Sequence, residues 1–211
     1  MSTLVLHSIA MSPYGWTAAL TAAEKGVDCD IVPIPEAGTP ERLKLHPFGK
    51  MPVLQHGDVF VYETLAITHY IDRAFAGPVL QPLEVKRQTD MLRWISIVNG
   101  YVFPLMNGLI KERTAAFWRG DAPDEAALDA MREPLAHQLR LINDTVWKQP
   151  FLAGDQLTLA DLFLVPHLHL VSTTPEGQQA LAHAPGAMAW LERLRARPSF
   201  EGTNPLTLRF G

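Results

Sequence analysis

The chain has 211 residues, of which 47% are hydrophobic and 19% charged, and its formal net charge is −4. This length fits one or two domains at roughly 100–200 residues each, and the apolar content suffices for a folded core. The acidic balance, without a cluster of Lys and Arg, argues against nucleic acid as a partner. Cys29 is the single cysteine, which excludes an internal disulfide and a multi-cysteine zinc site.

Targeting and membrane signals are missing from this sequence. The N-terminus lacks the basic and apolar regions of a signal peptide, and no apolar run approaches the roughly 18–20 residues that cross a bilayer. His167 and His169 form an H-x-H pair, but residues two apart on a helix do not face each other. We therefore expect a cytoplasmic protein with no membrane partner and no metal.

Strand and helix signals alternate through the first third of the chain. Their periodicity predicts, in chain order, a strand at 3–8, a helix at 13–26, a strand at 29–33, a short helix from Pro40, a hairpin over 51–62 and a helix over 63–74. The order β-α-β-α-β-β-α suits a small α/β domain and matches the thioredoxin-like fold.

Strand signals nearly vanish after the segment Ala76-Gly77-Pro78. The pattern predicts helices over 83–119 (interrupted at Pro104 and Gly108), 123–147, 158–172 (with a kink at Pro166) and 186–196, which Pro198 stops.

We therefore expect a thioredoxin-like α/β domain over 1–76, a linker over 77–82 and an all-helical domain over 83–211.

The segment His46–Ile67 combines three features that suit a ligand. Met51-Pro52 begins a strand, and proline is the one residue type before which a cis peptide bond costs little free energy. After the second strand, Glu63-Thr64 heads a helix and offers free backbone N–H groups, a hydroxyl and a carboxylate. Together these features predict a cradle for a small peptide-like ligand with a charged end.

Ser12 precedes Pro13 where the first strand gives way to the first helix. Ser is a favoured N-cap and Pro a favoured first helical residue, so a structural role explains the pair by itself. A capping hydroxyl can still donate its own proton to a ligand. At a helix N-terminus such a donor stabilises an anion and would lower the pKa of a bound thiol from its usual ~8.5.

These motifs resemble the glutathione transferase family. The runs Ala10-Met11-Ser12-Pro13-Tyr14, His46-Pro47-Phe48-Gly49 and Glu63-Thr64-Leu65-Ala66-Ile67 are similar to its serine-type members, especially the phi class and bacterial relatives. The resemblance implies that Ser12 donates to the thiolate of glutathione, the co-substrate, and that Pro52 is cis. It also implies that Met51 pairs with the extended tripeptide.

The resemblance assigns further contacts to glutathione. Thr64 and the helix N-terminus would receive the γ-glutamyl carboxylate, and Glu63 would pair with the ammonium group. The sequence departs from the phi pattern because Gly15, Trp16 and Thr17 stand where basic residues often follow the Ser. The loop at 36–45 is also shorter and lacks the usual His-Lys pair, so Lys50 is our candidate for the glycyl carboxylate.

Two alternatives concern the catalytic residue. Tyr14 is the second candidate for the thiolate donor, because a Tyr does this work in other classes of the family; packing against the helices would also explain it. Ser rather than Cys at position 12 argues against thiol-transferring members. Cys29 lies in an alternating strand and fits a small packed residue.

The segment before the predicted helix at 158–172 carries a structural motif. Thr158 and Asp161 have the spacing of a capping box, which the family uses in its helical domain, so we assign them no catalytic role.

The electrophile pocket should have apolar walls between the two domains. Its candidate wall residues are Met11, Pro13, Tyr14, Met106 and Ile110, although helical spacing also fits a core position for the last two.

The resemblance covers nearly the whole chain and implies a detoxifying transferase that forms a homodimer. It would add glutathione thiolate to small apolar electrophiles. The sequence leaves two other functions open: a non-catalytic binding or interaction module of this fold, and a glutathione-dependent peroxidase or dehalogenase.

Overall fold

The computed structural model describes residues 3–207, and they form two units. Of the described residues, 3–81 and 196–207 belong to the first unit, and 82–195 form the second. The second unit therefore ends at Arg195, whereas the sequence predicted a helical domain running to Gly211. The physical reason lies in the contacts of Arg197, Phe200 and Thr203, all of which join residues of the first helix.

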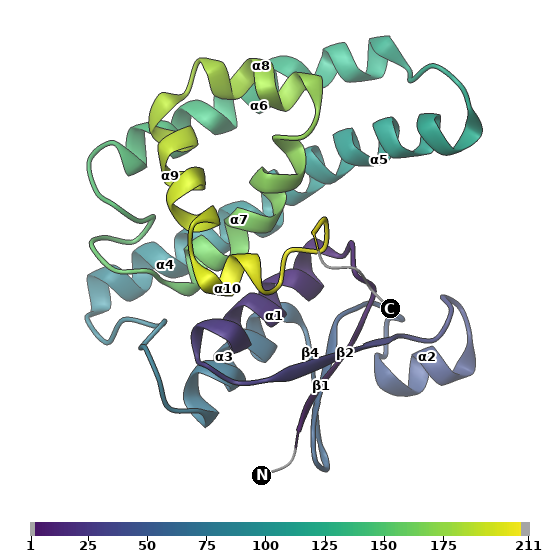
Figure 1. Cartoon of the computed structure of the whole chain (residues 1–211), viewed down its shortest axis with the longest axis vertical. Coiled ribbons are helices and arrows are strands. Elements are labelled where there is room, and N and C mark those ends of the chain that lie inside the picture. The colour runs from purple at the N-terminus through teal and green to yellow at the C-terminus, as the bar shows by residue number, and fades with distance from the viewer. Residues whose placement is uncertain (1–2, 208–211) are drawn as a thin grey trace. The chain divides into compact units, whose positions relative to one another are not determined.

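The first unit is built on a four-stranded sheet of order β2-β1-β3-β4. Its strands are β1 Leu4–Ser8, β2 Cys29–Pro33, β3 Val53–His56 and β4 Val59–Tyr62. β1 pairs in parallel with β2 and antiparallel with β3, and β3 pairs antiparallel with β4. The thioredoxin-like prediction is confirmed, and Figure 1 shows the sheet with its helices.

The helices of this unit are α1 Pro13–Glu24, α2 Pro40–Leu45, α3 Thr64–Ala74 and the short α10 Pro198–Glu201. α1 and α3 pack against each other and against the sheet. Alternate residues of β1 point toward these helices, because successive side chains of a strand face opposite ways. The resulting core comprises Leu4, Leu6, Ala18, Ala19, Ala22, Leu54, Ile67 and Ile71.

The second unit is helical throughout its regular structure. It contains α4 Val85–Ile97, a π-helical turn η1 Val98–Val102, α5 Phe103–Arg119, α6 Glu125–Val146, α7 Leu159–Val171, α8 Pro175–Ala182 and α9 Pro185–Arg195. Every residue of α7 is buried, as expected for a helix that is apolar on all sides. α4, α5, α8 and α9 pack around α7.

The sequence predictions differ from this unit in three places. Pro104 lies in the first turn of α5, which follows the π-helical turn Val98–Val102 directly, and Gly108 lies within α5 without ending it. α8 was not predicted. Pro198 follows the end of α9 as expected, but it also begins α10. Among residues 3–207, no helix is both long and apolar enough to cross a membrane.

Candidate functional site

The sheet register brings three separate segments to the same end of the first unit. His7 near the end of β1 pairs with Val53 at the start of β3, and Val53 also pairs with Tyr62 at the end of β4. The residues that follow β1, precede β3 and follow β4 must therefore lie near one another. These segments carry Ser12, Met51-Pro52 and Glu63-Thr64, so the fold gathers the residues that the sequence singled out.

Ser12 caps α1, as its position before Pro13 predicted. Its Oγ accepts a hydrogen bond from the Gly15 N–H at 3.1 Å, and the residue is 8% exposed. Among the described residues the hydroxyl donates to no acceptor. One hydroxyl carries both a donor and acceptor lone pairs, so its proton remains available to a ligand beside the positive end of the helix dipole.

Gly15 stands where the family pattern often has a larger basic residue, and the packing explains why. A Cβ at this position would lie 2.2 Å from the Ser8 Oγ and 3.1 Å from the Ser8 Cβ. The first turn of α1 thus approaches the end of β1 so closely that a side chain would force a displacement. This contact keeps Ser12 close to the sheet.

Met51 and Pro52 lie just before β3. The Met51–Pro52 peptide bond is cis, as the sequence analysis expected. The ladder pairings of β3 with both of its neighbours begin at Val53, so the Met51 backbone lies outside the sheet ladder.

The N-terminus of α3 is open. Glu63, its N-cap residue, has φ 70° and makes no capping hydrogen bond with its side chain. The first helical backbone bond runs from the Ile67 N–H to the Glu63 carbonyl at 2.9 Å, which leaves the N–H groups of the preceding turn facing outward. Thr64 is buried beside them. This arrangement suits a carboxylate.

Tyr14 lies in the first turn of α1, close enough to Glu63 for that carboxylate to affect its hydroxyl. Burial first, and then the negative charge of Glu63, raise the pKa of the Tyr14 hydroxyl well above its ordinary value. The phenol is therefore a weaker acid than usual and faces a carboxylate, which disfavours holding a second anion there.

Two residues at this site were missed by sequence reasoning. Arg42 is buried in α2, and its guanidinium donates to the carbonyl oxygens of Gly49 at 2.9 Å and Pro35 at 2.8 Å, which ties the loop on either side of α2. His46 is 1% exposed, and its Nε2 lies 3.6 Å from a Glu63 carboxylate oxygen. The only sequence signal for His46 was its place in the His-Pro-Phe-Gly-Lys run.

Lys50 belongs to the same group of charges. Its positive charge adds to the causes that lower the pKa of His46. Lys50 remains our predicted partner for the glycyl carboxylate of glutathione.

The predicted wall residues lie in both units. Met11 is about half exposed and Pro13 is partly buried at the start of α1. In the second unit, Met106 is fully buried in α5, whereas Ile110, one turn further on, is partly accessible. Only Ile110 of this pair presents surface that a ligand can reach without rearrangement.

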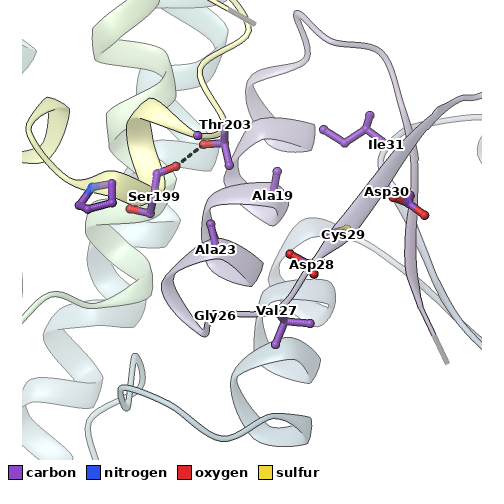
Figure 2. Close-up of a pocket in the computed structure, with 12 residues that line it drawn as sticks. Ala19, Ala23, Gly26, Val27, Asp28, Cys29, Asp30, Ile31, Ser199 and Thr203 are labelled. Atoms are coloured by element: carbon purple, nitrogen blue, oxygen red, sulfur yellow. Dashed lines mark hydrogen bonds between the residues drawn. The ribbon is translucent and has the colours of Figure 1, made fainter. Parts of the chain in front are cut away.

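Cys29 lies away from this group. Burial and the neighbouring Asp30 charge raise the pKa of its thiol to about 12, so it is not a nucleophile at neutral pH. Cys29 lines a cavity of about 600 Å³ between α1, β2 and the segment around α10, which Figure 2 shows with Ala19, Ala23 and Thr203 around it. None of the candidate ligand residues lines this cavity.

Thr158 and Asp161 form the predicted capping box of α7. Asp161 is fully buried, and its carboxylate accepts from the Thr158 N–H at 3.0 Å, the Thr158 hydroxyl at 3.1 Å, the Leu152 N–H at 2.9 Å and the Trp190 Nε1–H at 3.1 Å. Burial nevertheless raises its pKa to about 6. Its contacts are all structural.

His167 and His169 serve the packing of the second unit. The His167 ring lies 5.5 Å from that of Phe103, and His169 Nδ1 accepts from Arg195 at 2.9 Å. Burial lowers the pKa of His167 to about 3 and that of His169 to about 4. Residues 3–207 contain no cluster of three or more His, Cys, Asp or Glu side chains that could hold a metal ion.

Comparison with known proteins agrees with this geometry. Residues 6–79 match the model of the glutathione S-transferase N-terminal domain, and residues 125–197 match that of the C-terminal domain. The chain is 33% identical to glutathione S-transferase F14 of Arabidopsis thaliana, over 89% of this chain and 78% of that one. It is 31% identical to glutathione S-transferase 3 of Zea mays, over 96% and 94% respectively.

A solved structure of glutathione S-transferase I from maize, in complex with an atrazine glutathione conjugate, superimposes with a TM-score of 0.87. It is 29% identical and covers 97% of this chain and 98% of its own. These plant relatives are consistent with a phi-like protein. The chain belongs to the glutathione S-transferase family.

Proposed function

We propose that this protein is a glutathione transferase that adds the thiolate sulfur of glutathione to an electrophilic carbon of a small apolar compound. The observation that carries the proposal is the Ser12 hydroxyl at the N-terminus of α1, which donates to no acceptor within residues 3–207. The register of β1, β3 and β4 supports the proposal, because it brings the end of β1, the start of β3 and the end of β4 to the same end of the sheet.

Ser12 would donate a hydrogen bond from its hydroxyl to the sulfur anion. The hydroxyl and the helix dipole both favour the thiolate over the thiol, so the pKa of the bound thiol falls and more nucleophile is present at neutral pH. The thiolate then attacks carbon: a C–S bond forms, and with an aryl halide the carbon–halogen bond breaks and halide departs. Because Ser12 interacts with the anion specifically, its contribution appears in the rate rather than in affinity alone.

The other residues would bind the tripeptide. The N–H groups at the start of α3 and the Thr64 hydroxyl receive the γ-glutamyl carboxylate, and Glu63 pairs with the ammonium group. Met51 offers its backbone to the extended peptide, and Lys50 pairs with the glycyl carboxylate. These contacts are the same before and during reaction, so they set affinity for glutathione.

The electrophile would meet apolar side chains. Met11 and Pro13 flank Ser12 in sequence, and Ile110 presents accessible apolar surface in α5. Met106 would contribute as packing behind such a wall. This composition favours small, apolar electrophiles over charged ones.

Association with a second copy belongs to the same proposal. The first unit exposes several large apolar side chains on β4 and its neighbouring loop and helix: Phe48, Val59, Phe60, Tyr62 and Leu65. Exposed apolar side chains of this size favour burial against a partner. We infer a cytoplasmic homodimer with a detoxifying role.

Mass spectrometry of a reaction containing glutathione and an activated aryl halide tests the proposal, and the expected product is the thioether. Reduction of an organic peroxide, with glutathione disulfide as the product and no thioether from a panel of electrophiles, would favour the peroxidase alternative. A protein that neither binds immobilised glutathione nor forms either product would be an interaction module of this fold.

A further inference from the structure

His46 is held rigidly inside the first unit. It is 1% exposed, its Nδ1 accepts the Phe48 N–H at 3.1 Å, and its ring lies 5.0 Å from that of Tyr62. The hydrogen bond from Phe48 fixes the Nδ1 edge of the imidazole, and the contact with the Tyr62 ring fixes the orientation of its plane. A side chain held in this way can orient a neighbour.

The hydrogen bond from Phe48 determines which ring nitrogen carries the proton. A backbone N–H can only donate, so Nδ1 must be unprotonated and the neutral ring carries its proton on Nε2. Burial lowers the pKa of His46, Arg42 and Lys50 act in the same direction, and only the Glu63 charge opposes them. The ring is therefore neutral at physiological pH, with its single N–H at Nε2.

The Nε2–H faces Glu63. The Nε2 to Oε1 distance is 3.6 Å, which is longer than a hydrogen bond but closes to one with a small rotation of the carboxylate. The Glu63 side chain is 65% exposed and accepts no hydrogen bond within residues 3–207. Its backbone, at φ 70°, is the only non-glycine in the left-handed region among the described residues. The surrounding structure therefore holds the Glu63 main chain in an unusual conformation. Its carboxylate lies beside the His46 Nε2–H, whose position is fixed.

We propose that His46 is a positioning residue that holds the Glu63 carboxylate in the orientation that pairs with the ammonium group of glutathione. This inference rests on the proposed function, because it concerns how the same site recognises one end of its substrate. His46 does not touch the reacting sulfur. It acts through Glu63 and governs affinity for the γ-glutamyl end.

The test compares His46→Phe with the wild-type protein, using glutathione and an N-acetylated glutathione whose ammonium charge is removed. His46→Phe keeps a ring against Tyr62 but removes the N–H. We expect KM and Kd for glutathione to rise about tenfold, as for a weakened contact to a charged group, while kcat stays within about twofold. Affinity for the N-acetylated compound should be the same for both proteins, because no ammonium remains to be oriented.

Three further variants separate this role from a structural one. Glu63→Gln should reproduce the loss, and the double variant with His46→Phe should lose no more than Glu63→Gln does. His46→Gln, which restores a side-chain N–H donor, should recover part of the affinity. His56→Phe is the matched control, since its imidazole contacts Tyr70 elsewhere in the same unit and should leave both affinities unchanged.

A measurement on the wild-type protein keeps the proposal testable if His46→Phe fails to fold. ¹⁵N spectra should show His46 as the Nε2–H tautomer, with its Nε2 resonance shifting when glutathione binds and not when the N-acetylated compound binds. An Nδ1–H tautomer, or equal loss of affinity for both compounds in His46→Phe, would overturn the positioning role alone. Failure of the wild-type protein to bind glutathione at all would overturn the proposed function as well.

Discussion

Arg197 and Glu24 form a two-pronged ion pair across 173 residues of sequence. Arg197 Nε and Nη2 donate to the two Glu24 carboxylate oxygens at 2.6 and 2.7 Å, and the Ser199 hydroxyl also donates to Glu24. Burial raises the pKa of Glu24, but the hydrogen bonds from Arg197 and Ser199 outweigh it and hold the pKa below its ordinary value. The pair fastens the C-terminal segment to the last residue of α1.

Arg197→Ala should destabilise the first unit. The Glu24 side chain is only 5% exposed, so losing its partner leaves a nearly buried carboxylate with fewer donors, at a cost of about 2 kcal/mol. Denaturant unfolding measures this loss. Arg140→Ala is the control, because Arg140 and Glu133 form an exposed pair whose loss should leave stability nearly unchanged. Equal losses from both variants would contradict the importance of the Glu24 contact.

Asp161→Ala should be among the most damaging single substitutions in the second unit. It removes the acceptor for four hydrogen bonds and leaves buried N–H groups on Leu152 and Trp190 without it, at a cost of at least about 3 kcal/mol. Thr158→Ala removes only one side of the capping box and should cost about 1 kcal/mol. The free energy of unfolding separates the two. Similar values would show that the box, rather than the buried carboxylate, dominates.

Acidification from pH 7.5 to pH 5 should lower stability. His167 and His169 have folded-state pKa values of about 3 and 4, below the ordinary value of 6.5, so the unfolded chain takes up protons that the folded chain refuses. Asp161 acts in the opposite sense, because its raised pKa lets the folded state gain a proton near pH 6. The net loss should be on the order of 2 kcal/mol, measured by chemical unfolding at both pH values.

His167→Gln isolates the histidine contribution to this pH dependence. It removes one titrating group that contributes about 2 kcal/mol over this range, so most of the difference in unfolding free energy between the two pH values should disappear. Carboxyl groups whose pKa is lowered, such as Glu24 and Asp72, lose their contribution only below about pH 4.5 and do not enter this range, whereas His46, whose pKa burial also lowers, adds to the loss in both proteins. An unchanged pH dependence in the variant would contradict the buried, neutral state of His167.

Phe48→Ser should weaken self-association if the first unit meets a second copy. Phe48 is 74% exposed, and its removal from an apolar patch costs contact area in a dimer but little in the monomer. Sedimentation velocity should show a dimer for the wild-type protein and a larger monomer fraction for the variant. Phe117→Ser, a similarly exposed position in α5, is the control and should leave the dimer intact.

Local sequence patterns predicted most of the fold. Alternation over 51–62 gave the hairpin, and the Ser12-Pro13 pair marked the start of α1. The same patterns missed α8 and misassigned the C-terminal segment. The return of that segment depends on contacts such as Arg197 with Glu24, whose members lie too far apart in sequence for any periodicity to join them.

The residues of the candidate site were also predictable only in part. Ser12 and Thr64 were predictable because each occupies a helix start, which has a local signature. His46 was not, because its role depends on three contacts that only the folded chain creates, with Phe48, Tyr62 and Glu63.

The most direct test of the account compares the rate of thioether formation from glutathione and an activated aryl halide in the wild-type protein and in Ser12→Ala. The account predicts a measurable wild-type rate that falls about 100-fold in the variant, as when a donor to a developing anion is lost. Thr174→Ala controls for the lost cap, since Thr174 accepts from the Gly177 N–H at 3.1 Å as Ser12 does from Gly15, and it should keep the rate. A Ser12→Ala protein that retains the wild-type rate would contradict Ser12 as the thiolate donor and move that role to Tyr14.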